Sequence, residues 1–300
     1  MRNYFQFLLV LLFFISCQKE TQNNIDISNI EANFKIFRFE QDFYTNKGQN
    51  LVELKENFPL LFPDETPDSI WIAKINNSDE QELFQETQKK YNSLLHIEDE
   101  LSKLFKHIKH YNPTFLAPDV ITILSNIDYT YRTIYTDNLL FISLDVYLGD
   151  DHPFYSDYPS YIRKNNTDER IVVDVASNII NSTISFSNNR SFLAKMIHEG
   201  KKMYLLDLYL PSKSDPIKIG YPKDKFDWAT MNEEQVWRYF IENDLLYSTD
   251  TQLNKRFIEN APFSKFYLSE DTKSPGRIGQ WIGWQIVRSY MVNNDVSLQD

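Results

Sequence analysis

The chain has 300 residues and carries 31 Lys and Arg against 42 Asp and Glu, a formal net charge of −11. This acidity argues against a nucleic-acid-binding protein, which needs a basic face to displace counterions from phosphates. Hydrophobic residues at 42% indicate a well-cored globular domain, and the single cysteine rules out an intramolecular disulfide or a metal site of clustered cysteines.

The N-terminal segment is typical of a secretory signal peptide. Arg2 gives a basic start, and an apolar run over residues 5–15 follows, shorter than the roughly 20 residues that span a bilayer. Cys17 stands directly after this run and resembles the cysteine of a bacterial lipobox, with Phe14 where leucine is usual. We therefore expect residues 1–16 to be a lipoprotein signal peptide and Cys17 to be acylated, palmitate included. The alternative is an ordinary signal peptide that contains a cysteine.

The segment after the cysteine is polar. Residues 17–33 are rich in Asn, Thr and Gln and predict a tether between lipid and domain. Gln18, rather than aspartate, follows the cysteine and favours the outer membrane over retention at the inner one. Since neither a repeat nor a linker divides the remainder, we expect a single globular α+β domain over residues 34–300, mostly helical with a small β-sheet.

The first third of this domain predicts one strand and several helices. Alternating apolar residues over 34–39 predict the strand, and residues 51–62 predict a short helix that Pro59 is expected to end earlier. Ser78 is a good N-cap, and apolar residues three and four apart predict one long helical stretch over 81–110. We expect His96, His107 and His110 on this stretch to lie at the surface, because no other metal-ligating residue converges on them.

The middle of the chain is β-rich and the rest is helical. Strands are predicted over residues 119–124, 133–135 and 139–144, and the third is apolar enough to lie centrally in a sheet. Helices are predicted over residues 168–184, 191–210, 232–243 and 277–292.

His198 and Glu199 lie in an amphipathic pattern that resembles the active-site helix of zincin metallopeptidases. In that motif two histidines one helical turn apart bind zinc, and the glutamate after the first is the general base. Here Lys202 takes the place of the second histidine, and a charged ammonium has no lone pair for a metal. Two interpretations stay open: a buried hydrogen-bonded pair, or a zinc site with His198 as ligand and Glu199 as base.

Four further residues have the chemistry to complete such a site. Glu234 could supply a metal ligand from a later helix, Glu233 is not excluded from that role, and both could be a solvated first helical turn. Asp151 and His152 have the residue types of a metal site, but they lie in a turn at Gly149, where aspartate commonly binds local backbone.

Three of the seven glycines fall within residues 276–283, and Gly279 and Gly283 lie one turn apart on a predicted helix. A glycine inside a helix costs about 1 kcal/mol relative to alanine, so close approach of a backbone or a ligand must offset it. We expect tight helix packing with Gly200 as the partner; the alternative is a ligand cleft flanked by Trp281. That alternative pocket comprises Asp151, His152, Gly279, Trp281 and Gly283.

Six stretches carry a resemblance to a known family. They are residues 34–39, 147–155, 196–202, 239–250, 261–267 and 274–290. On these stretches the chain resembles the gliding motility lipoprotein GldB family over nearly its whole mature length. The resemblance implies a lipid-anchored envelope protein that is required for surface gliding and is associated with the machinery that moves adhesins. The His198-Glu199 pair and residues 276–290 are also similar to predicted zinc proteases, although Lys202 departs from their motif.

The leading hypothesis is a non-catalytic component or assembly factor of the gliding machinery, on a degenerate zincin-like metallopeptidase scaffold. It would need no cofactor, its partners would be other envelope proteins, and its old pocket would bind a peptide or partner. The alternative is a zinc-dependent peptidase or hydrolase that uses His198 and Glu199. A third hypothesis, a glycan-binding lipoprotein, depends only on exposed aromatic residues.

Overall fold

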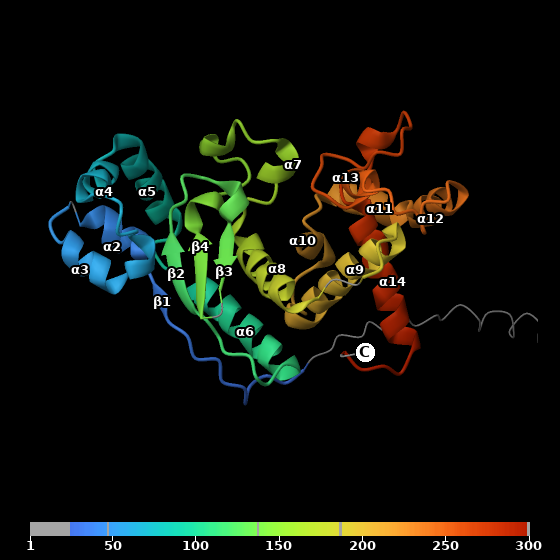
Figure 1. Ribbon diagram of the computed structural model, residues 1–300, viewed down its shortest axis with the longest axis horizontal. Coiled ribbons are helices and arrows are strands. Elements are labelled where there is room, and N and C mark those ends of the chain that lie inside the picture. The colour runs from blue at the N-terminus through green and yellow to red at the C-terminus, as the bar shows by residue number, and fades with distance from the viewer. Residues whose placement is uncertain (1–24, 47, 137, 186–187, 299–300) are drawn as a thin grey trace, which may run out of the picture.

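The computed structural model describes residues 25–46, 48–136, 138–185 and 188–298 (Figure 1). Over this part of the chain the fold is α+β and mostly helical, with a small four-stranded sheet, as the sequence predicts. Within it, no helix combines the length and the apolar character needed to cross a bilayer. Cys17 and its signal segment lie outside the described residues, so lipidation stays a prediction.

The sheet has the order β1 (Ile36–Phe37), β2 (Asp119–Ile123), β4 (Leu139–Ser143) and β3 (Thr133–Tyr135). The first three strands are parallel and β3 is antiparallel to β4. The parallel strands therefore end at one common edge. Three of the four strands lie where the sequence predicts them. The strand predicted over 34–39 shrinks to two residues because a helix already begins at residue 39.

Five helices fill the first third of the described chain. They are α2 (Phe39–Thr45), α3 (Leu51–Asn57), α4 (Asp68–Ile75), α5 (Ser78–Lys90) and α6 (Leu95–Tyr111). The first four form a lobe beside β1 and β2, drawn in blue to teal in Figure 1, with its own buried aromatic core around Phe43 and Phe62. The helix predicted over 51–62 ends at Asn57, because Pro59 starts a separate 3-10 turn.

Three details of this lobe and of α6 differ from the sequence prediction. The stretch 81–110 is two helices separated at residues 91–94, where Asn92 and Ser93 favour a turn over a helix. Asn77 rather than Ser78 is the N-cap, and its side chain accepts two backbone N–H groups of the first turn. His107 is buried rather than exposed, because it flanks the apolar stripe of α6 and its Nδ1 lies 2.8 Å from a backbone oxygen one turn earlier.

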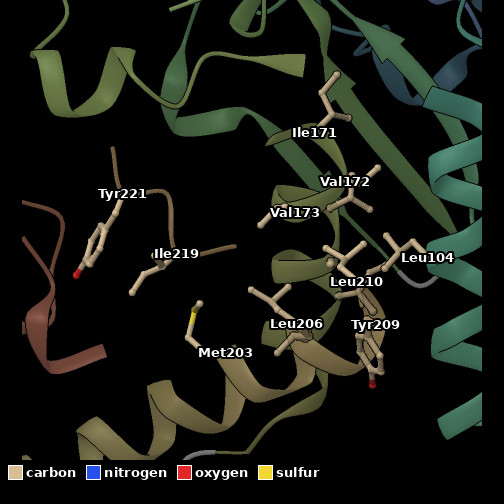
Figure 2. Packing of buried hydrophobic residues seen from close by; sticks show 14 of the residues in the cluster. Leu104, Ile171, Val172, Val173, Met203, Leu206, Tyr209, Leu210, Ile219 and Tyr221 are labelled. Atoms are coloured by element: carbon tan, nitrogen blue, oxygen red, sulfur yellow. The ribbon is translucent and has the colours of Figure 1, made fainter. Parts of the chain in front are cut away.

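The second half of the chain is helical. Its helices are α7 (Ser160–Arg163), α8 (Ile171–Thr183), α9 (Phe192–Tyr209), α10 (Asp215–Ile219), α11 (Lys223–Met231), α12 (Glu233–Glu242), α13 (Gln252–Phe257) and α14 (Ile278–Asn293). Helix α8 packs against β3 on one side and α9 on the other, so it joins the sheet to the C-terminal helices. Figure 2 shows Val173 of α8 facing Met203 and Leu206 of α9, with Ile219 beside them.

Candidate functional site

Helix α9 carries the predicted His-Glu pair, and both side chains are engaged. Nζ of Lys202 donates to Glu199 Oε1 at 2.8 Å, and Gln280 Nε2 of α14 donates to Glu199 Oε2 at 3.4 Å. His198 is only 6% exposed, and burial together with the charge of Lys202 lowers its pKa below the usual value. The lysine therefore holds the carboxylate that a zincin would use as its base.

The two glutamates at the start of α12 have different surroundings. The side chain of Glu234 is 77% exposed and accepts a hydrogen bond from Arg238 Nη2 at 2.7 Å on its own helix. Glu233 is half-buried instead, and burial raises its pKa. The solvated first turn considered for both residues therefore describes Glu234 alone.

The turn at Asp150 and His152 contacts the segment that follows it in the chain and helix α5. Lys164 Nζ donates to Asp150 at 3.0 Å, and His152 Nδ1 accepts the Phe154 backbone N–H at 3.3 Å. The other ring nitrogen of His152 lies 3.8 Å from Glu86 on α5. These contacts do not include α9 or α12: the partners are Lys164, Phe154 and, on α5, Glu86.

A zinc site therefore does not fit the side chains as arranged. Within the described residues, no group of three or more His, Cys, Asp and Glu side chains is gathered closely enough to hold a metal ion. His198 has neither Glu234 nor His152 beside it in such a group. A zinc ion needs four donors at about 2.0–2.3 Å, so metal binding here would require rearrangement of several side chains.

The glycines of α14 lie in a close helix crossing, as the sequence predicts. A Cβ atom on Gly283 would lie 1.8 Å from the carbonyl oxygen of Met196, and one on Gly200 would lie 2.1 Å from that of Gly283. A Cβ on Gly279 would lie 2.8 Å from the carbonyl oxygen of Phe257. The helices α9 and α14 thus touch backbone to backbone, which fills the space that a ligand would need.

A cleft of about 660 Å³ opens elsewhere, and its lining includes residues of α7 and of the start of α11. It is lined from the segments 129–132, 160–165, 170–174, 220–225, 260–262 and 275–277. Arg132 closes one wall, and its carbonyl oxygen accepts the N–H of Ser143, the last residue of β4. The cleft thus lies beyond the carboxyl ends of the parallel strands, the usual place for ligands on open α/β sheets.

Two guanidinium groups flank one carboxylate in this cleft, and the guanidinium of Arg277 also lines it. Asp174 accepts from Arg170 Nη2 at 2.6 Å and from the Tyr147 hydroxyl at 3.0 Å, and it lies 3.7 Å from Arg132 Nη1. Arg277 donates through Nη2 to the carbonyl oxygen of Ile219 at 2.7 Å. Within the described residues, no carboxylate lies within ion-pair distance of Arg277.

Arg170 and Arg277 are held on the same short stretch of backbone. Arg170 Nη1 donates to the carbonyl oxygens of Ile217 and Lys218, the latter at 3.1 Å, and Arg277 binds the next one along. These carbonyls end α10, where cations are favourable. Burial lowers the pKa of Arg277, and the repulsion from Arg170 acts in the same direction.

Strained backbone flanks the cleft on both sides. Asn126 and Ile127, which lead into one wall, and Arg277 on the other have φ between 56° and 58°, the left-handed region that branched and long side chains avoid. Asp145 fixes the first loop, because its buried carboxylate accepts the N–H groups of Ser125 and Ile127 at 2.6–3.1 Å. Burial raises the pKa of Asp145 to about 6.

None of the five residues of the predicted pocket lines this cleft. Arg132, Arg170 and Asp174 carry no local sequence signal, because their convergence depends on how distant segments fold. Arg277 lies inside the unusual glycine passage, where its position at a helix start after Pro-Gly was the available signal.

A family model described as "Gliding motility protein GldB" matches residues 20–300, nearly the whole chain. No curated protein and no solved structure gives a match to this chain.

Proposed function

Because the chain belongs to the gliding motility protein GldB family, we propose that it is a lipid-anchored envelope protein that acts in gliding without catalysis. Its partners are then other envelope proteins of the gliding machinery. The scaffold would be a degenerate relative of the zincin metallopeptidases, since α9 keeps their His-Glu pair at the expected place on an amphipathic helix.

The anchoring half of this proposal depends on Cys17. The cysteine follows a basic start and a short apolar run, which is the arrangement of a lipobox. Buried acyl chains contribute roughly 0.8 kcal/mol per methylene, so several together hold a soluble domain on a membrane. Gln18 after the cysteine favours the outer membrane.

Fractionation of cells tests the anchor. Cys17→Ser should move the protein from the membrane fraction to the soluble one, while Ser16→Ala, the neighbouring change outside the acylated position, should leave it on the membrane. If the Cys17→Ser protein stays with the membranes, the lipid anchor is wrong.

The single observation that carries the non-catalytic half is the contact between Lys202 and Glu199 at 2.8 Å. A zincin base must accept a proton from a metal-bound water, and its second histidine must supply a nitrogen lone pair. Here one lysine occupies the histidine position and also binds the carboxylate. Glu199 also has a structural role, because its other carboxylate oxygen accepts a hydrogen bond from Gln280 and so links α9 to α14.

A gliding assay with Glu199→Gln separates a base from a structural residue. An amide cannot take up a proton, but it can still hydrogen-bond Lys202 and Gln280, so we expect gliding to persist at normal protein level. Loss of gliding by a variant that accumulates normally would overturn the non-catalytic proposal. Zinc analysis of the purified chain gives an independent check: stoichiometric zinc that disappears in His198→Ala would favour the hydrolase instead.

A further inference from the structure

The cleft has the opposite charge to the rest of the molecule. Five cationic and two acidic side chains line it, whereas the whole chain has a net charge of −11. Asp150 pairs with Lys164 at the rim, and Lys225 donates to three backbone carbonyls. The excess positive charge therefore lies with the arginines inside.

These arginines lack a matching number of carboxylates. Asp174 serves both Arg132 and Arg170, whose side chains are only 16% and 13% exposed. Arg277 donates to one carbonyl oxygen and lies 5.7 Å from the centre of the Tyr221 ring, and within the described residues its guanidinium makes no second hydrogen bond. Taking charge out of water is costly unless an opposite charge compensates it. An anion in the cleft would supply that compensation.

The backbone conformation of Arg277 indicates that its side chain has a functional role. Its φ of 58° suits glycine, which has no steric penalty in that region. The preceding residue is Gly276, where an added Cβ atom would lie 2.0 Å from the carbonyl oxygen of Ala261. Strain of this kind persists mainly where function needs a particular side chain in place. Here it aims a guanidinium into the cleft.

The walls beyond the arginines are polar and aromatic. Tyr129, Tyr161 and Asn260 are among the residues that line it, and the volume of about 660 Å³ is that of a small-molecule site. Guanidinium groups bind phosphate and carboxylate oxygens in a bidentate manner. We propose that this cleft binds a small ligand that carries a phosphate or carboxylate group on a hydrogen-bonding body, and that Arg277 is its principal anion-binding residue.

Calorimetry on the full chain, purified in detergent, tests the site with four probes. Glucose 6-phosphate and inorganic phosphate represent phosphate, glucuronate represents carboxylate, and glucose is the neutral control. We expect at least one anion to bind with an affinity that falls as salt is added, and glucose not to bind. Comparison of glucose 6-phosphate with glucuronate tells which anion the site prefers. Absence of binding by all three anions would overturn the proposal.

Arg277→Gly is the decisive variant, because it removes the guanidinium and relieves the left-handed backbone at once. We expect it to remain folded and to bind the preferred anion at least about tenfold more weakly. Arg238→Gln, a surface arginine on α12, removes the same charge away from the cleft and should leave the affinity unchanged. Equal weakening by both variants, or none by Arg277→Gly, would overturn the assignment.

Lys164→Gln gives a second measurement if Arg277→Gly proves unstable. This lysine lies at the rim with its side chain 51% exposed, so its loss should leave the fold intact and weaken anion binding about two- to threefold. Anion affinity unaltered in Lys164→Gln would then count against the cleft as the site. Binding here needs neither the lipid anchor nor a catalytic step, so failure of the proposed function would leave this inference standing.

Discussion

Two charged clusters meet at the short helix α10 and differ in how their charges are matched. The balanced cluster consists of Asp207, Asp215, Lys218 and Arg288. The cleft cluster consists of Arg132, Arg170, Asp174 and Arg277. In the first, Arg288 binds both carboxylates in a bidentate manner at 2.6–2.8 Å, and Trp284 adds a hydrogen bond to one of them. In the second, Arg132 and Arg170 share Asp174, and within the described residues no carboxylate lies within ion-pair distance of Arg277.

The difference separates a structural site from an open one. Two cations and two carboxylates satisfy each other, so the balanced cluster needs nothing from outside and locks α9, α10 and α14 together. Burial works to raise the pKa of Asp215, but hydrogen bonds and attraction from Arg288 outweigh it and leave that pKa below the usual value. The cleft cluster instead uses backbone carbonyls as partial partners, which leaves net positive charge facing solvent.

Removal of Arg288 should give the largest loss of stability. Arg288→Met would leave Asp215 with only the more distant Lys218, 3.8 Å away, so we expect the free energy of unfolding to fall by about 4 kcal/mol. Urea unfolding measures it. Arg238→Met, at an exposed pair, should change the free energy by less than about 1 kcal/mol. Similar losses in the two variants would mean that the balanced cluster does not hold α9, α10 and α14 together.

The packing of α9 against α14 also depends on backbone contact, which Gly283→Ala would break. The added methyl group meets the carbonyl oxygen of Met196 at 1.8 Å, so α9 and α14 must move apart. We expect a loss of about 3 kcal/mol in unfolding free energy. Ser289→Ala, on the exposed face of the same helix, is the matched control and should be nearly neutral. A tolerated Gly283→Ala would contradict the close crossing.

Acidification should stabilise the folded state through Asp145, the buried carboxyl that fixes the loop leading into the cleft. Burial raises the pKa of this carboxyl to about 6, whereas in an unfolded chain the value is about 3.9. The folded state therefore holds a proton that the unfolded state has lost, and acidification from roughly pH 7 to roughly pH 5 should stabilise it by about 1 kcal/mol through this group. Asp145→Asn cannot titrate, so the difference between the two unfolding free energies should change by that amount.

Parallel pH profiles for the wild type and Asp145→Asn would contradict the raised pKa. Asp99→Asn provides the control, because that carboxylate is exposed in a surface pair with Lys103. Its unfolding free energy should follow the wild-type profile over the same pH range.

Sequence patterns predicted the elements better than the site. The β-rich middle and the glycine contact between α9 and α14 followed from local signals: alternation of apolar residues, and glycines one turn apart. The break at residues 91–94 was missed because the apolar stripe continues across it, so periodicity alone could not show that α5 and α6 point differently.

The cleft could not be predicted because its charges come from segments far apart in the chain. Arg132 precedes a strand, Arg170 precedes a helix, and Arg277 starts another, so only the fold brings them together. The metal hypothesis gains no support from the fold for the opposite reason. Its residues have suggestive types and spacing, but the fold places Glu234 in solvent and His152 beside α5.

The ion pair between Lys202 and Glu199 should contribute less to stability than the balanced cluster. Among these substitutions, Lys202→Gln should therefore cause the smallest loss of unfolding free energy. Both side chains are about one-fifth exposed, so water competes for them, and pairs of this spacing on one helix are worth little. We expect a loss of about 0.5 kcal/mol in unfolding free energy. Lys201→Gln, an exposed lysine next to it, is the control. A loss as large as that of Arg288→Met would instead mean that this pair holds α9 and α14 together as the balanced cluster does. The main role of Glu199 would then be to stabilise the fold.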